Sequence, residues 1–173
     1  MVTASKLSAW FLWLGLYSFL GWAYEVALWR IDPGIWINRG FLFGPLCPIY
    51  GTGAMIALLL LYRRVSSIPL LFLAGVVMAT GVEYITSFVL EQLFGLRWWD
   101  YSYLRFQING RISLLGALVF GVLTVLLIRV MHPRVEALTH RLTDKTKVRA
   151  ASILALLIAI DCCMTVAHLL ANA

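Results

Sequence analysis

The sequence predicts an all-α integral membrane protein, and three features of the 173-residue chain support this class. The mean hydropathy is high, at +0.89. Only 13% of the residues are charged, whereas about a quarter are charged in a typical soluble domain. Five apolar runs recur along the chain, each close to the roughly 20 residues that a helix needs to cross a bilayer. Helices are expected because hydrocarbon offers the backbone no other hydrogen-bond partners.

The expected spans are, in chain order, Leu7–Trp29, Phe43–Tyr62, Ile68–Phe94, Ile112–Met131 and Ala150–Leu170. They account for nearly the whole chain, so we expect a single transmembrane domain over residues 1–173. All three cysteines fall within these spans, and a disulfide framework is therefore not expected.

The basic residues predict an orientation, because Lys and Arg collect on the cytoplasmic side of membrane proteins. The N-terminal tail and the second and fourth segments between the expected spans carry nine of the 14 basic residues. The first and third segments between the spans carry the other five. This bias predicts a multi-pass protein of the cell membrane with a cytoplasmic N-terminus and an extracytoplasmic C-terminus. The net charge of +6 then fits attraction to anionic lipid head groups, and no nucleic-acid partner is expected.

The fourth connection, "HPRVEALTHRLTDKTKVR", carries an amphipathic pattern. Val135, Leu138 and Leu142 recur at helical spacing among basic residues. Residues 134–149 are therefore expected to form either a short cytoplasmic helix on the membrane surface or a solvated basic loop.

Acidic side chains lie inside the apolar runs, where an uncompensated charge is costly. Thr80, Glu83, Ser87 and Glu91 form one helical stripe on the third span, and Glu25 lies near the outer end of the first. We expect the first, third and fourth spans to meet at a polar interior that opens outward. The alternative is that the glutamates only hold helices together through arginine pairs. Asp161 and His168, in the fifth span, are expected to be satisfied core residues.

Two stretches resemble each other and suggest an internal repeat. "NRGFLFGPLCPIYG" (Asn38–Gly51) and "NGRISLLGALVFG" (Asn109–Gly121) each begin with Asn, Arg and Gly and end with an aromatic residue and Gly. Spans one and two would then be a parallel repeat of spans three and four, a device known in transporters.

The stretch Asn109–Gly121 predicts a helix N-terminus that favours the binding of an anion. Asn109 can cap the fourth span, and its first N–H groups beside Arg111 favour an anion. Asn38 and Arg39 would do the same for the second span. The candidate substrate- or ion-binding residues are Glu25, Asn38, Arg39, Glu83, Glu91, Asp100, Asn109 and Arg111. These groups also suit a cation or a proton relay, although no dedicated metal site and no cofactor is predicted. The alternative is an interfacial aromatic belt with capped, charge-neutralised helix ends.

Several motifs resemble one family when taken together. They are "YSFLGWAYE" (Tyr17–Glu25), "NRGFLFGPLCPIYG", "EYITSFVLEQLFGLRWWDYS" (Glu83–Ser102) and "NGRISL" (Asn109–Leu114). In this order, across about residues 8–135, they are similar to the ABC-transporter type IV, or CmpB-like, membrane family. The resemblance implies a transporter permease. The chain has no phosphate-binding loop of the G-x-x-x-x-G-K-[ST] type, so ATP hydrolysis would require another subunit.

Three functions remain open from the sequence. The first is a permease-like protein that binds or moves a solute through a polar, outward-facing cavity. The second is an intramembrane enzyme acting on a lipid or lipid-linked phosphate, with Glu25 or Glu83 as general base and Arg39 and Arg111 holding the phosphate. The third is a structural subunit of a membrane complex. Expected partners are membrane lipids, a cytoplasmic ATPase or other membrane subunit, and a second copy of the chain.

Overall fold

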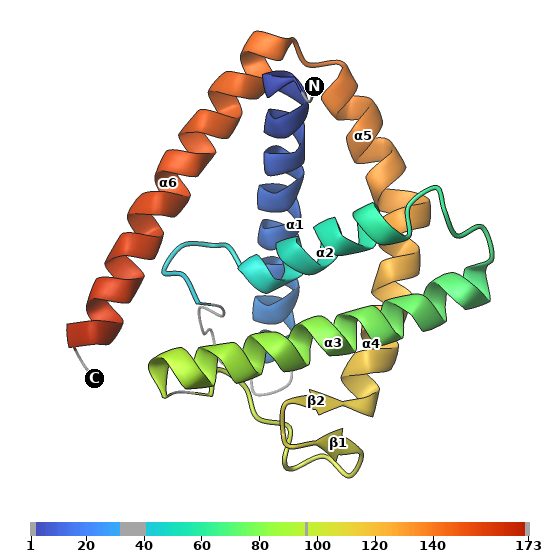
Figure 1. Ribbon diagram of the computed structural model, residues 1–173, viewed down its shortest axis with the longest axis vertical. Coiled ribbons are helices and arrows are strands. Elements are labelled where there is room, and N and C mark those ends of the chain that lie inside the picture. Colours follow the sequence, from blue (N-terminus) through green and yellow to red (C-terminus); the bar gives the residue numbers. More distant parts are fainter. Residues whose placement is uncertain (1–2, 32–40, 96, 172–173) are drawn as a thin grey trace. The chain divides into compact units, whose positions relative to one another are not determined.

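The computed structural model of the protein describes residues 3–31, 41–95 and 97–171 (Figure 1). Of these described residues 77% are helical, which confirms an all-α membrane protein. The elements are α1 (Ala4–Ile31), α2 (Pro48–Leu60), α3 (Ile68–Phe94), β1 (Gln107–Ile108), β2 (Ile112–Ser113), α4 (Leu114–Leu126), the π-helical turn η1 (Leu127–Met131), α5 (His132–His140) and α6 (Asp144–Ala171).

Within the described residues, four helices are long and apolar enough to cross a membrane. They are Ala4–Leu28, Ile68–Phe94, Leu114–His140 and Asp144–Ala171, the third of which joins α4, η1 and α5. The expected spans at Leu7–Trp29, Ile68–Phe94, Ile112–Met131 and Ala150–Leu170 overlap these four helices.

The second expected span, Phe43–Tyr62, forms only a short helix. With 13 residues, α2 is about 20 Å long at 1.5 Å per residue, against roughly 30 Å of hydrocarbon. Pro48 is its first residue, which is a preferred position for proline. Proline also disfavours a helical conformation for the residue before it, here Cys47. The structure therefore has four long helices and a short one where the sequence predicted five full-length spans.

The basic stretch 134–149 is neither one surface helix nor one loop. Its first part continues the long helix to His140, and α6 begins at Asp144. The break has a local cause, because the Thr143 hydroxyl oxygen accepts the N–H of Thr146 at 3.2 Å and so caps a new helix. Only residues 141–143 of the stretch lie outside a helix.

The described residues cluster into two compact units, which are treated separately below. The first contains residues up to 55 together with those from 135 onward. In it α1 packs on α6, and Gly15 leaves room for the side chain of Leu154. Trp13 Nε1 donates to Thr139 Oγ1 at 2.9 Å. The close contact at Gly15 and one indole hydrogen bond thus help to hold α1 against the C-terminal part of the chain.

The second unit contains residues 56–134, in which α3 packs along α4. A Cβ atom on Gly75 would lie 2.6 Å from Thr124 Cβ, so the two helices approach closely because a hydrogen occupies this position. Leu71 is completely buried, and Ile128 nearly so. Tyr62 also makes an edge-to-face contact with His132 in this unit, at 4.7 Å between the ring centroids.

Glycines of the two similar stretches make matching contacts in their own units. A Cβ atom on Gly51 would lie 2.6 Å from the carbonyl oxygen of Leu14 and would also meet Ser18 Oγ. Leu14 and Ser18 stand eleven and seven residues before Glu25.

In the second unit, a Cβ atom on Gly121 would lie 2.6 Å from Val76 and 2.7 Å from Phe72. These residues stand seven and eleven positions before Glu83. The two glycines therefore meet equivalent positions relative to the glutamates. This is the geometry that a two-helix repeat requires, and the repeat itself stays a prediction.

Candidate functional site

The polar stripe on α3 faces the connection between α3 and α4. Glu83, Ser87 and Glu91 follow one another at one-turn intervals, so they share a face of the helix. Glu83 is only 6% exposed and Ser87 only 4%. The hydroxyl of Tyr101 donates to Glu83 Oε1 at 2.9 Å. A residue of the connecting loop thus reaches a carboxylate well inside an apolar helix.

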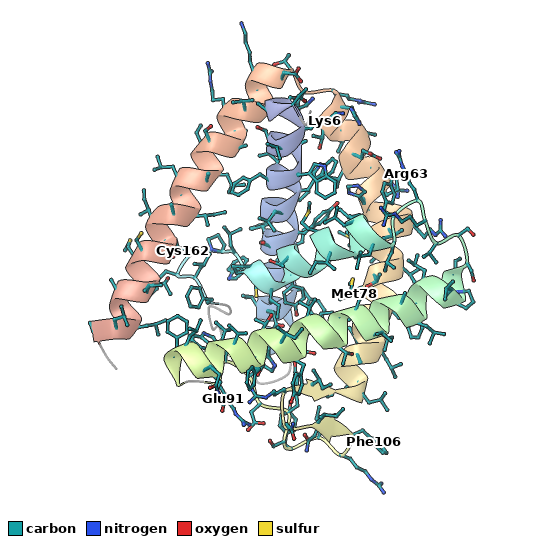
Figure 2. All side chains as sticks on the ribbon, viewed as in Figure 1. Lys6, Arg63, Met78, Glu91, Phe106 and Cys162 are labelled. Atoms are coloured by element: carbon teal, nitrogen blue, oxygen red, sulfur yellow. The ribbon has the colours of Figure 1, made fainter. Side chains whose placement is uncertain are left out.

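Glu91 lies between two arginines. Arg97 Nε donates to Glu91 Oε1 at 2.9 Å, and a terminal guanidinium nitrogen of Arg111 donates to Oε2. Arg111 is itself 8% exposed, and its other terminal nitrogen donates to Ser87 Oγ at 3.1 Å. Its guanidinium lies 5.7 Å from the centroid of the Tyr84 ring, within the range of a cation–π contact. This network holds the loop against α3 (Figure 2, where Glu91 and Phe106 are labelled).

Asn109 forms a turn and does not cap the fourth span. Its φ is +53° and that of Gly110 is +68°, as in the two-residue turns that Asn-Gly favours. The N–H of Arg111 closes the turn by donating to the Ile108 carbonyl oxygen at 3.0 Å. The cap of α4 is Ser113, whose side-chain oxygen accepts the N–H of Gly116 at 3.1 Å. The predicted cap was wrong because Asn109 lies in the turn of the short hairpin β1–β2, and strand β2 separates it from the helix.

The loop itself is tied by its own polar groups. Asp100 Oδ1 accepts the N–H of Ser102 at 2.9 Å and its hydroxyl at 2.5 Å. The hydrogen bond from the Ser102 hydroxyl and, to a lesser extent, that from its N–H hold the pKa of Asp100 below its ordinary value. Trp99 Nε1 donates to the Arg111 carbonyl oxygen at 2.8 Å. The hydrogen bond to Glu91 raises the pKa of Arg97, so this arginine stays charged.

The first unit contains a second glutamate with a tyrosine partner. The hydroxyl of Tyr50, on α2, donates to Glu25 Oε1 on α1. The ring of Tyr24 meets that of Tyr50 edge-on, with 6.1 Å between their centroids. Glu25 and Glu83 thus each accept a hydrogen bond from a tyrosine hydroxyl. Tyr50 lies in a helix, whereas Tyr101 lies in a loop.

Asp161 holds the segment before α2. It accepts the N–H of Phe43 at 2.9 Å and that of Gly44 at 2.8 Å, one on each carboxylate oxygen. The hydroxyl of Thr165 donates to it at 3.3 Å, and His168 stacks edge-on with Phe43. Asp161 is therefore hydrogen-bonded within the chain, but it is only partly buried and His168 is exposed, so neither is the core residue that the sequence predicted.

The structure brings five of the eight predicted site residues into one cluster on the second unit. They are Glu83, Glu91, Asp100, Asn109 and Arg111. Glu25 belongs to the first unit, and Asn38 and Arg39 lie outside the described residues. No group of three or more metal-binding side chains occurs in the described part of the chain.

Three groups that contact the predicted site residues were not among them, namely the hydroxyls of Tyr50 and Tyr101 and the guanidinium of Arg97. Tyr101 and Arg97 lie within a stretch conspicuous for its polarity, but no spacing rule pairs a loop residue with a given helix position. The hydrogen bond of Tyr50 depends on how α2 crosses α1, which its apolar sequence does not reveal.

Comparison with known proteins identifies a family. A family model with the description "Putative ABC-transporter type IV" matches residues 12–166. No curated protein and no solved structure matches the chain. The match runs through both units and reaches residue 166 in α6, further than the motifs that suggested the resemblance. This match confirms the resemblance, and the chain belongs to the family Putative ABC-transporter type IV.

Proposed function

We propose that the chain is the membrane component of a transport system and that Glu83 binds a charged solute entering from the outer side. The family is transport-related by its description. One observation carries the assignment to Glu83. A carboxylate that is 6% exposed lies inside an apolar helix and accepts a hydrogen bond from Tyr101, which belongs to a loop. Acidic groups at such depth usually serve transport pathways or proton relays.

The partners of the two α3 glutamates favour different roles. Separating Glu91 from Arg97 and Arg111 would break two ion pairs, one of them with a buried arginine, which is strongly unfavourable. The Tyr101 hydroxyl is a neutral donor, and breaking this one hydrogen bond separates no ions. Glu91 therefore anchors the loop in this proposal, and Glu83 binds the solute when Tyr101 moves away.

Glu25 is the proposed counterpart of Glu83. Both accept a tyrosine hydroxyl, and in each unit a glycine contacts the positions seven and eleven residues earlier. Asn38, Arg39 and Asn109 remain proposed contributors to solute binding. The cell-membrane location, a cytoplasmic ATPase or other membrane subunit as partner, a second copy of the chain and bound lipids are also part of the proposal.

The test compares Glu83→Gln with Glu91→Gln. Glutamine keeps the shape of Glu83 and still accepts a hydrogen bond, but it lacks the charge and the proton chemistry. Protein purified in mild detergent is incubated with a small-molecule extract, and the retained compounds are identified by mass spectrometry. We expect Glu83→Gln to unfold near the wild-type temperature and to lose a retained solute. Glu91→Gln should instead unfold at a lower temperature.

The reverse result for Glu83 would contradict the proposal. A Glu83→Gln protein that is clearly destabilised, yet retains the same compounds per folded molecule, would show that Glu83 only holds helices together. Identical stability and identical retained compounds in Glu83→Gln and wild type would also overturn the assignment.

The outward orientation has its own test. Tyr103 is 80% exposed in the loop that carries Tyr101, so a cysteine placed there is accessible on its side of the membrane. We expect Tyr103→Cys, in a background without the native cysteines, to react with an impermeant thiol reagent in intact cells. Reaction only after the membrane is opened would place this loop in the cytoplasm and reverse the topology.

A further inference from the structure

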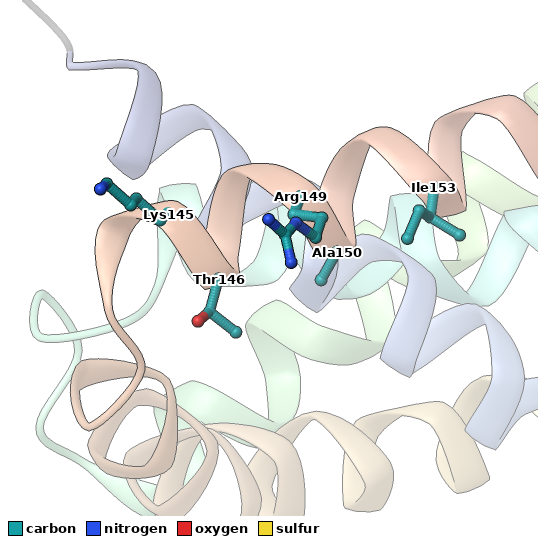
Figure 3. A pocket seen from close by; sticks show the side chains of 5 residues that line it. All are labelled: Lys145, Thr146, Arg149, Ala150 and Ile153. Carbon is teal, nitrogen blue, oxygen red and sulfur yellow. The ribbon is translucent and has the colours of Figure 1, made fainter.

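The first turns of α6 carry a hollow that the proposed transport function does not use. It is lined by Lys145, Thr146, Arg149, Ala150 and Ile153 and has a volume of about 250 Å³ (Figure 3). Pockets that enclose a complete small molecule usually measure roughly 300–1,000 Å³. A hollow of this size on one helix suits one end of a larger molecule.

The polar end of the hollow is cationic. Lys145 and Arg149 are four residues apart, so their side chains are neighbours on the same face of the helix. Both residues are exposed, and neither makes an ion pair within the described residues. Lys147 differs, because it pairs with Asp144 at 3.3 Å. The Thr146 hydroxyl shares a hydrogen bond with Thr143 at 2.9 Å and keeps capacity for another.

The other end of the hollow is apolar and continues into a candidate membrane span. Ile153 is 55% exposed, and Leu156 and Leu157 beyond it are also exposed. No charged residue occurs between Arg149 and Asp161. The hollow therefore straddles the point where α6 changes from basic to apolar. A ligand that fits both ends has an anionic group joined to a hydrocarbon chain.

We propose that this hollow binds the head group of an anionic phospholipid. The phosphate lies between Lys145 and Arg149, and the first acyl carbons lie over Ala150 and Ile153. An acidic peptide would satisfy the two cations but would leave the apolar half of the hollow in contact with water. Inorganic phosphate would leave the same half empty. The phospholipid is the occupant that both halves favour, and it is present wherever α6 enters a bilayer.

Two variant pairs separate a built site from diffuse attraction. Lys145→Gln/Arg149→Gln removes the two cations that line the hollow. Arg141→Gln/Lys147→Gln is the matched control, since it removes the same charge from the same region but not from the hollow. Ala150→Leu is the third variant, which fills the hollow and leaves every charge in place.

Binding is measured with the full chain in detergent, by titration with fluorescent phosphatidylglycerol and, for comparison, fluorescent phosphatidylcholine. Each basic residue near an anionic lipid surface contributes about 1 kcal/mol, or roughly fivefold in affinity. We expect Lys145→Gln/Arg149→Gln to weaken phosphatidylglycerol binding about 25-fold, and the control pair to weaken it much less. Ala150→Leu should weaken it severalfold, and inorganic phosphate should not displace the lipid.

Each contrary result overturns the proposal in a different way. Equal loss in the two charge pairs, or no effect of Ala150→Leu, would mean diffuse attraction without a site. Full displacement by inorganic phosphate would identify a phosphate site that does not need a lipid. Equal affinity for phosphatidylcholine would remove the role of charge. If Lys145→Gln/Arg149→Gln loses its helical circular dichroism, Ala150→Leu and the control pair still decide.

Discussion

The hydrogen bond between Tyr101 and Glu83 can be tested by removing one oxygen atom. Tyr101→Phe keeps the ring and deletes the hydroxyl that donates to Glu83 at 2.9 Å. A hydrogen bond to a charged group contributes about 1.5–3 kcal/mol to stability, whereas those between membrane helices average about 0.6 kcal/mol. The larger value, for a hydrogen bond to a charged group, applies here because Glu83 is only 6% exposed and water cannot readily replace the lost donor. We expect Tyr101→Phe to lower the free energy of unfolding by about 1.5–3 kcal/mol.

The assay is equilibrium unfolding in mixed micelles, followed by circular dichroism while the fraction of denaturing detergent is raised. Tyr103→Phe is the matched control. It deletes the same atom in the same loop from a residue that is 80% exposed, and it should change the free energy by less than about 0.5 kcal/mol. The double variant Tyr101→Phe/Glu83→Gln completes a double-mutant cycle, in which contacting residues should couple by roughly 0.5–3 kcal/mol. Equal effects of the two phenylalanine variants, or zero coupling, would refute the reasoning.

Three further outcomes are expected. Gly75→Ala should lower the free energy of unfolding by about 1–3 kcal/mol through overpacking. Gly81→Ala is the control, because its Cβ position is open space, and it should be neutral or slightly stabilising. Equal Tm shifts in the two variants would contradict the close contact between α3 and α4. Asp161→Asn should speed amide hydrogen exchange in the segment before α2, because one of the two carboxylate acceptors is lost, and unchanged exchange would contradict the tether. The pKa of Asp100 is lowered in the folded protein, so Asp100 stabilises the loop fully at pH values above its ordinary pKa, and this stabilisation is lost as the pH falls through the lowered pKa. Ser102→Ala should therefore raise the pKa of Asp100 measured by NMR. An unchanged titration of Asp100 would refute the hydroxyl as the cause.

The sequence predicted the helices well because their signal is local. Apolar length identified the four long helices, and the 3.6-residue period placed Glu83, Ser87 and Glu91 on one face of α3. All three contact the following connection. These predictions succeed because hydropathy and periodicity depend on neighbours along the chain.

Two predicted helix starts differ from the structure although the sequence contained the signal. Pro48 marks a helix start inside the run Phe43–Tyr62, but apolar content alone suggested one long span. Asn109–Gly110 is a strong hairpin signal, and Ser113 is a good helix cap, yet the predicted span began too early to allow either. At the starts of both α2 and α4, the proline, turn and capping residues determine where the helix begins, and hydropathy does not. The partners of Arg97 and Tyr101 are a different case, because they depend on the path of the loop.

The chemical character of the partners described above distinguishes three acids of the long apolar helices, Glu83, Glu91 and Asp161. Glu91 is compensated by two guanidinium groups, and Asp161 by two backbone N–H groups and a hydroxyl. Both arrangements fix a neighbouring segment, and breaking either leaves charge or backbone polarity exposed to an apolar medium. Glu83 accepts the hydroxyl of Tyr101, and that donor can leave without separating charges. Glu91, about two turns further along the same face of α3, is instead held by two arginines. The neutral hydroxyl of Tyr101 is thus a contact between the loop and α3 that breaks without separating an ion pair, which fits the proposed exchange at Glu83 with a solute.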